Sequence, residues 1–109
     1  MEIKQTDLRA KAIKFEVQDG NKIAGRAYLY LIYNDLGEGH YGLLEDVFVE
    51  EKYRGQGVGN QLLTTVIATA KKLDCYKLIG TSRYSRPQVH AWYERLGFRD
   101  YGKEFRMDF

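Results

Sequence analysis

The chain has little of several features that would classify it at once. It holds one cysteine, Cys75, so no intramolecular disulfide can form, which favours a reducing compartment. It has one proline, Pro87, and no repeated or low-complexity segment, which argues against a linker or a repeat array. No apolar run approaches the roughly 20 residues of a membrane span, and the first residues lack an apolar signal-peptide region. We therefore expect a cytoplasmic protein without membrane association.

An excess of one charge is also missing, because 17 basic and 15 acidic residues leave a net charge of +2. Proteins that bind nucleic acid usually carry a marked basic patch. Four arginines in the last third of the chain are the alternative: Arg83, Arg86, Arg95 and Arg99. These arginines are scattered through amphipathic segments, so the simpler interpretation is that they lie on a solvent-exposed face of those segments. We expect no nucleic-acid partner.

The length and composition describe a small globular protein. A chain of 109 residues with 44% hydrophobic and 29% charged residues suits one domain with one core. We take residues 1–109 as that single domain. No cluster of histidine, cysteine and carboxylate residues has the spacing of metal ligands, so we expect no metal.

The first half of the chain predicts three strands. Residues 13–17 alternate between apolar and polar, a turn signal follows at 19–21, and residues 23–33 form a second strand-like run. These two runs predict a hairpin. Residues 34–39 contain two glycines and predict a loop. Residues 41–49 then predict a third strand, antiparallel to the second.

The second half predicts helices alternating with strands. Residues 60–73 have a helical apolar face and lead to a short strand at 76–81, which a helical crossover makes parallel to the third. Ser85 and Gln88 have capping-box spacing before a helix that Gly97 ends. Alternation at 105–109 predicts a last strand. The fold class is therefore α/β, a mixed sheet with helices packed on it.

The most informative segment joins the third strand to the first helix through three alternate glycines. Backbone N–H groups at the positive end of a helix dipole bind anions, and glycines allow a ligand to approach closely. The Walker and dinucleotide motifs do not fit, because Gly59 is followed by Asn60-Gln61 and comes one residue early for the dinucleotide pattern. A phosphate-bearing ligand is the first hypothesis, and a loop without a ligand is the alternative.

Two signatures in order resemble the GNAT superfamily of acetyl-CoA-dependent N-acetyltransferases. Arg54-Gly55-Gln56-Gly57-Val58-Gly59 follows a Val-Phe-Val strand, and Trp92-Tyr93-Glu94-Arg95-Leu96-Gly97-Phe98 ends the second helix. The resemblance covers residues 41–109 closely and the first two strands by architecture. It implies a GNAT-like mixed central sheet with the order strand, strand, strand, helix, strand, helix, strand.

The resemblance also implies where acetyl-CoA, the co-substrate, binds. The backbone of the turn would hold the pyrophosphate, and the preceding strand would pair with the pantetheine arm. The thioester would lie where two parallel strands splay apart, close to the second helix. The residues concerned are Arg54, Gly55, Gln56, Gly57, Val58, Gly59 and Asn60 in the turn, and Val47, Phe48 and Val49 in the strand.

The family's reaction is direct attack of a neutral amine on the thioester in a ternary complex. It needs a base for the amine and an acid for the leaving thiolate. Tyr93 matches the tyrosine usually proposed as the acid, although a core aromatic is the alternative on this apolar face. Glu45 is the favoured base, directly or through water, and a carboxylate balanced by nearby lysines is the alternative. Asp46 is its neighbour, and strand alternation predicts that only one of the two faces the cleft.

Two departures from the family pattern carry expectations. Many relatives have an asparagine seven residues before the tyrosine where this chain has Arg86, whose guanidinium could contact a CoA phosphate instead. The first family strand and two helices are missing or reduced to residues 1–9. We therefore expect an unusually open acceptor site, which either admits a large substrate such as a protein N-terminus or lysine or is completed by a second subunit in a homodimer. The acceptor is a small-molecule or protein amine, and a non-catalytic acyl-CoA sensor or scaffold is the alternative function.

Overall fold

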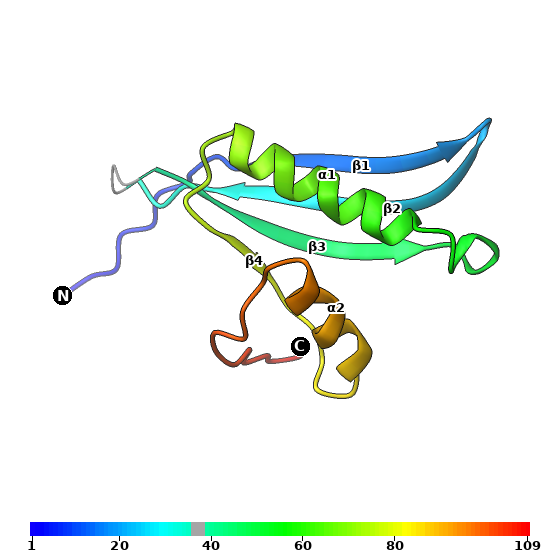
Figure 1. Ribbon diagram of the computed structural model, residues 1–109. Coiled ribbons are helices and arrows are strands. Elements are labelled where there is room, and N and C mark those ends of the chain that lie inside the picture. Colours follow the sequence, from blue (N-terminus) through cyan, green and yellow to red (C-terminus); the bar gives the residue numbers. More distant parts are fainter. Residues whose placement is uncertain (36–38) are drawn as a thin grey trace.

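Four strands form one mixed sheet in the computed structural model, which describes residues 1–35 and 39–109 (Figure 1). The order across the sheet is the order along the chain. The β1–β2 and β2–β3 pairs are antiparallel and the β3–β4 pair is parallel, which confirms the predicted hairpin and crossover. Residues 36–38 of the predicted loop lie outside the described residues. The strands are β1 (Lys11–Asp19), β2 (Lys22–Ile32), β3 (Tyr41–Val49) and β4 (Leu78–Gly80).

Helix α1 (Val58–Lys72) makes the crossover from β3 to β4 and covers one face of the sheet (Figure 1). A short 3-10 helix, η1 (Glu51–Tyr53), precedes it. The apolar positions of α1 recur every three or four residues, so they form one stripe that packs on the inward side chains of β2 and β3. The buried apolar residues are Ala24, Ala27, Leu29, Leu31, Leu44, Val58, Leu62, Leu63, Val66 and Ala70.

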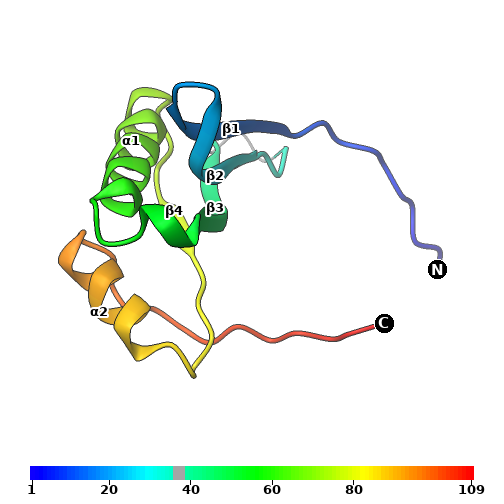
Figure 2. The same ribbon diagram turned by 90° about the vertical axis from the view of Figure 1, so that its right-hand side faces the viewer.

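Helix α2 (Pro87–Arg95) lies on the same side of the sheet as α1, and none of its residues is fully buried (Figure 2). Gly97 ends it as predicted, with φ 106°. The N–H of Gly97 donates to Glu94 and that of Phe98 to Tyr93, both at 3.0 Å, which is a Schellman motif. The predicted capping box is wrong: Arg86 is the N-cap, so Ser85 lies outside the capping position.

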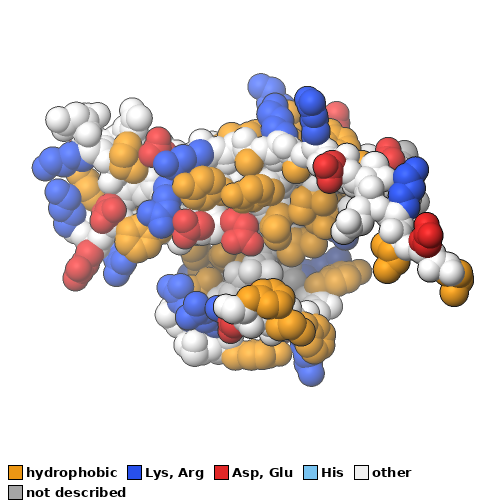
Figure 3. All heavy atoms as spheres, turned by 180° about the vertical axis from the view of Figure 1, so that it is seen from behind, with side chains coloured by type: hydrophobic (Ala, Val, Ile, Leu, Met, Phe, Trp, Pro, Cys, Tyr) orange, Lys and Arg blue, Asp and Glu red, His pale blue; other side chains and the backbone are white. Residues whose placement is uncertain are grey.

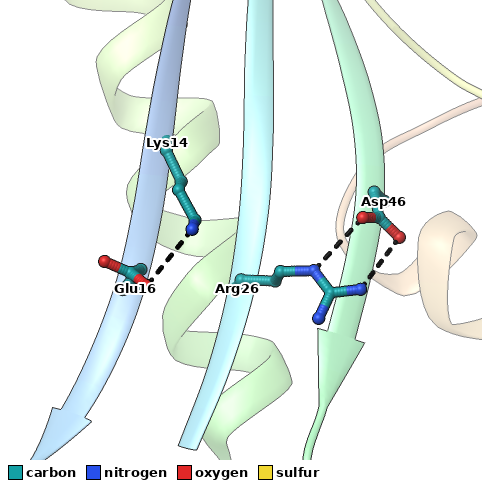
Figure 4. Close-up of polar contacts among 4 residues, drawn as sticks. All are labelled: Lys14, Glu16, Arg26 and Asp46. Atoms are coloured by element: carbon teal, nitrogen blue, oxygen red, sulfur yellow. Dashed lines mark hydrogen bonds and ion pairs between the residues drawn. The ribbon is translucent and has the colours of Figure 1, made fainter. Parts of the chain in front are cut away.

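A β-bulge interrupts β3 at Asp46. Tyr28 pairs with Glu45 and Arg26 with Phe48, so two residues of β3 oppose one of β2. Asp46 takes φ 49°, and its carboxylate accepts two hydrogen bonds from Arg26, at 3.1 and 3.4 Å (Figure 4). The bulge breaks the two-residue period. The prediction that Glu45 and Asp46 point to opposite faces is therefore wrong.

The predicted last strand at residues 105–109 is also wrong. The chain after α2 is extended but pairs with no strand among the described residues, and it passes beside α2 and beneath the sheet toward the side opposite α1 (Figures 1 and 2). Phe105 and Met107 are 91% and 76% exposed. Alternation describes the side chains of a strand, but a strand also needs a hydrogen-bonded neighbour. The observed order therefore ends at α2, on an otherwise GNAT-like sheet.

Candidate active site

The two parallel strands of the sheet part after a short pairing. β4 pairs with β3 only through Gly42–Leu78, Leu43–Ile79 and Leu44–Gly80, whereas β3 continues to Val49. The second half of β3 therefore has no β4 neighbour. The parallel crossover through α1 begins at that end of β3, which is where open α/β sheets bind ligands.

A cleft of about 510 Å³ opens where the strands part. It receives side chains from β3, from the loop after β4, from α2 and from the C-terminal segment. The cleft brings the predicted acid and base, Tyr93 and Glu45, together with Arg86 and Val47. Its lining residues are Leu44, Glu45, Asp46, Val47, Thr81, Ser82, Arg83, Arg86, Val89, Trp92, Tyr93, Glu104 and Arg106.

The Tyr93 ring is held between aromatic neighbours. Its centroid lies 5.2 Å from that of Phe98 and 5.8 Å from that of Trp92. Burial raises the pKa of the Tyr93 phenol, the nearby Arg86 lowers it, and the Glu45 carboxylate raises it; the net shift is upward. A tyrosine with a pKa above its usual value near 10 is protonated at neutral pH. Tyr93 can therefore donate a proton into the cleft.

Glu45 and Asp46 both line the cleft because of the bulge, but they differ in their partners. Asp46 is engaged by Arg26, whereas Glu45 makes no ion pair within residues 1–35 and 39–109. Both also border a shallow hollow with Tyr28, Tyr30 and Leu43 on the face of the sheet away from α1. Figure 3 shows this face, with acidic side chains near its middle. Of the two carboxylates, Glu45 is therefore the one without an ionic partner among the described residues.

The glycine turn presents the first amides of α1. Gly55 and Gly57 have φ 77° and 83°, conformations that glycine adopts without strain, and Gly57 is the N-cap. Its carbonyl accepts the N–H of Gln61 at 3.0 Å. The amides of Val58, Gly59 and Asn60 then have no partner within the helix. They lie at the positive end of the helix dipole, so the predicted anion site fits this turn.

The side chains of the turn brace its backbone. Arg54 donates from Nε to the Val49 carbonyl at 3.0 Å, and Gln56 donates from Nε2 to the Lys52 carbonyl at 3.1 Å. Each side chain thus has one nitrogen engaged with a main-chain carbonyl. That the turn acts mainly through its main chain stays a prediction.

Trp92 joins α2 to this turn, a link that the sequence reasoning missed. Its indole N–H donates to Asn60 Oδ1 at 2.6 Å. A Cβ on Gly59 would lie 3.1 and 3.2 Å from two atoms of the indole, so the ring packs against the bare backbone. The aromatic at residue 92 was visible in the second signature, but nothing in the sequence paired it with Asn60.

Comparisons with known proteins decide the family. The profile of the Acetyltransferase (GNAT) family matches residues 3–98, most of the chain. The chain belongs to the GNAT family. A solved structure of a Trypanosoma brucei acetyltransferase has a TM-score of 0.78 at 31% identity, covering 90% of this chain and 69% of that one.

Two curated relatives are similar over part of their length. Glucosamine 6-phosphate N-acetyltransferase of Trypanosoma brucei brucei is 38% identical over 68 residues, which cover 62% of this chain and 44% of that protein. Aminoglycoside N(6')-acetyltransferase type 1 of Stenotrophomonas maltophilia is 36% identical over 59 residues, 54% of this chain and 39% of that protein. This GNAT chain thus spans less than half the length of either.

Other reactive side chains of this GNAT domain lie outside the cleft. His40 Nε2 lies 2.6 Å from the Leu73 carbonyl, and His90 Nε2 lies 2.7 Å from the Arg83 carbonyl, so both imidazoles are held by backbone. Burial raises the pKa of the Cys75 thiol, which disfavours the reactive thiolate. Among the described residues, no three histidine, cysteine or carboxylate side chains gather as metal ligands, and no helix is long and apolar enough to cross a membrane.

Proposed function

We propose that this GNAT domain, residues 1–109, is an N-acetyltransferase that moves the acetyl group of acetyl-CoA to a primary amine by direct attack. The observation that carries the proposal is the meeting of Tyr93 and Glu45 in one cleft, at the parting of β3 and β4. An acid and a base are the two groups that this transfer requires. The free amides at the start of α1 add the anion site that a CoA ester needs.

The cofactor side of the cleft is assigned to the glycine turn and to β3. The amides at the start of α1 would bind the pyrophosphate, within the turn formed by residues 54–60. Residues Val47–Val49 of β3, which have no β4 neighbour, would offer main-chain groups to the pantetheine arm, except that the Val49 carbonyl already accepts from Arg54. Arg86 lines the cleft beside Tyr93 and would lie near the reacting end of the cofactor.

The proposed chemistry uses the two side chains in turn. Glu45, directly or through water, takes a proton from the acceptor ammonium. The neutral nitrogen forms a bond to the acetyl carbon, and the carbon–sulfur bond of the thioester breaks. The leaving thiolate takes the proton of Tyr93, whose raised pKa keeps that proton available at neutral pH. The acetylated nitrogen releases its surplus proton as the amide forms, which restores the Tyr93 phenol, and Glu45 returns its proton to solvent.

For the acceptor, we propose an amino sugar. The supporting observation is that both curated relatives bear the names of enzymes for such amines, glucosamine 6-phosphate and aminoglycosides. The matched segments cover 44% and 39% of these relatives. The identity of the acceptor therefore needs an experiment separate from the test of acetyl transfer.

We further propose that the protein acts as a cytoplasmic homodimer. The support is the exposed apolar surface of the C-terminal segment, where Phe105, Met107 and Phe109 alternate without a neighbouring strand among the described residues. An unpaired extended segment is a ready partner for a second chain. Light scattering at micromolar concentration tests this, and a monomer would contradict it.

The catalytic proposal is tested with Tyr93→Phe. We expect acetyl transfer to fall by about 100-fold or more, the usual contribution of a general acid or base. Tyr84→Phe is the matched control, because Tyr84 is 82% exposed and does not line the cleft. Unchanged turnover in Tyr93→Phe would remove Tyr93 from the mechanism.

A binding measurement separates the enzyme from a non-catalytic acyl-CoA sensor. Thermal unfolding is followed with acetyl-CoA, CoA and ATP, and a specific ligand at 100 times its dissociation constant stabilises by about 2.7 kcal/mol. We expect stabilisation by both CoA species and not by ATP, in the wild type and in Tyr93→Phe. Stabilisation without transfer to any amine would favour the sensor.

A further inference from the structure

The cleft carries charges of both signs on different walls. The negative wall is β3, where Glu45 is free and Asp46 is engaged by Arg26. The positive wall is the loop before α2 together with its N-cap, which places Arg83 and Arg86 in the cleft. In Figure 3 basic side chains lie on the part of the molecule below the sheet, which α2 and the C-terminal segment build.

We infer that the acceptor carries an oxyanion, a phosphate or a carboxylate, in addition to its amine, and that Arg83 and Arg86 bind it. This inference rests on the proposed acetyl transfer and deepens it. An acceptor with an ammonium near Glu45 and an anion near the two arginines matches the separated charges of the cleft. A polycationic acceptor would meet two uncompensated guanidinium groups.

The partners of the charged side chains leave these two arginines available. Within residues 1–35 and 39–109, Arg83 and Arg86 make no ion pair, whereas Arg106, which also lines the cleft, is paired with Asp108 at 2.8 Å. Glu104 adds a carboxylate from the C-terminal segment. A guanidinium presents a planar fork of donors that matches an oxyanion with two hydrogen bonds.

The loop that carries Arg83 is held in place by backbone contacts. Its carbonyl lies 2.7 Å from His90 Nε2, and the same carbonyl accepts the N–H of Arg86 at 3.2 Å. These contacts tie the loop to the first turns of α2. The two arginines therefore project from a braced turn, which lowers the entropy cost of binding an anion between them.

The phosphates of CoA are not the anion in question, because they belong at the other end of α2. Trp92 lies at the end of α2 that contacts the glycine turn, since its indole bonds to Asn60 and packs against Gly59. Arg86 precedes Trp92 by six residues, about 9 Å along a helix that rises 1.5 Å per residue. Arg83 lies beyond Arg86, in the loop after β4. The arginines thus face the acceptor side of the cleft.

The test measures binding and turnover separately. Calorimetry in the presence of CoA uses glucose 6-phosphate, glucuronate and glucose, none of which has an amine. We expect glucose 6-phosphate or glucuronate to bind and glucose not to bind, and Arg83→Gln or Arg86→Gln to weaken that binding about tenfold or more, as loss of a charge-assisted hydrogen bond does. Arg95→Gln, on the same helix but outside the cleft, is the control and should bind normally.

Turnover is then compared for glucosamine and glucosamine 6-phosphate. We expect a higher kcat/KM for the phosphate, and loss of that preference in Arg83→Gln with the KM for acetyl-CoA unchanged. Equal kcat/KM values, or no binding of either anionic sugar, would overturn the inference and leave the transferase proposal standing. Binding of an anionic sugar without transfer to any amine would sink the proposed function and retain the anion site. A raised KM for acetyl-CoA in both arginine variants would instead assign the arginines to the cofactor and overturn the inference.

Discussion

The sheet with α1 and the segment from α2 onward are packed to different degrees. All ten buried apolar residues come from β2, β3 and α1. Helix α2 contributes none, and the chain after it is exposed. The glycine turn starts a helix anchored in the core, whereas Tyr93 sits on the thinly packed helix. The proposed site therefore combines a rigid cofactor wall with a catalytic tyrosine held mainly by aromatic contacts.

The largest expected effect tests the packed half. Leu63 is fully buried, so Leu63→Ala should lower the free energy of unfolding by about 2–5 kcal/mol through lost burial and a residual cavity. Urea denaturation measures it. Leu96→Ala, in the half-buried C-cap of α2, is the matched change and should cost less. Equal losses would erase the distinction between the two regions.

The next effect tests the contact between α2 and the start of α1, where the two regions meet. Gly59→Ala would place a methyl group 3.1 Å from the Trp92 ring, and overpacking of this kind costs about 1–3 kcal/mol. We expect lower stability and weaker acetyl-CoA binding, measured by calorimetry. Gly102→Ala is the control, because a Cβ there meets nothing within 4 Å. If both variants behaved as wild type, α2 would be shown to move freely against α1.

A smaller effect tests the hydrogen bond within the same contact between α2 and α1. Trp92→Phe keeps an aromatic ring but removes the hydrogen bond to Asn60, which should cost about 0.5–1.5 kcal/mol. Asn60→Ala should cost a similar amount, and the double variant should cost less than the sum of the two, since both remove one bond. Additive losses in this thermodynamic cycle would mean that the bond contributes nothing.

The smallest effect concerns the hydrogen bond that links η1, just before the glycine turn, to the β1–β2 hairpin. The Tyr53 hydroxyl donates to Asp19 Oδ2 at 2.7 Å, and this bond, then burial, raises the pKa of Tyr53. A raised folded-state pKa means that the contribution is complete below the unfolded pKa near 10 and is lost as the pH rises through the folded value. The stability difference between wild type and Tyr53→Phe, followed from pH 8 to 11, should shrink at the alkaline end. A constant difference would argue against the bond.

Most elements of the fold were predictable because they follow local periodicity. The hairpin, the crossover helix and the helix ended by Gly97 all appear near the expected residues. Of the residues that line the cleft, the second signature marked Trp92 and Tyr93. Local patterns suffice where an element's own side chains choose its conformation.

The failures share one cause, which is dependence on a distant partner. Whether residues 105–109 form a strand depends on a neighbour to pair with. The bulge at Asp46 depends on the register against Arg26, which is twenty residues away. The Trp92–Asn60 bond spans 32 residues. None of these follows from spacing along the chain.

Gly80, the last residue of β4, has a consequence of its own. A Cβ at this position would lie 3.3 Å from the Tyr93 ring and 3.4 Å from a methyl group of Leu44. Because Gly80 has no side chain, the Tyr93 ring can pack directly against the end of β4. A methyl group added at this position would push the ring outward without touching the glycine turn. If Tyr93 and the glycine turn act as proposed, Gly80→Ala should change the rate of acetyl transfer more than the binding of acetyl-CoA.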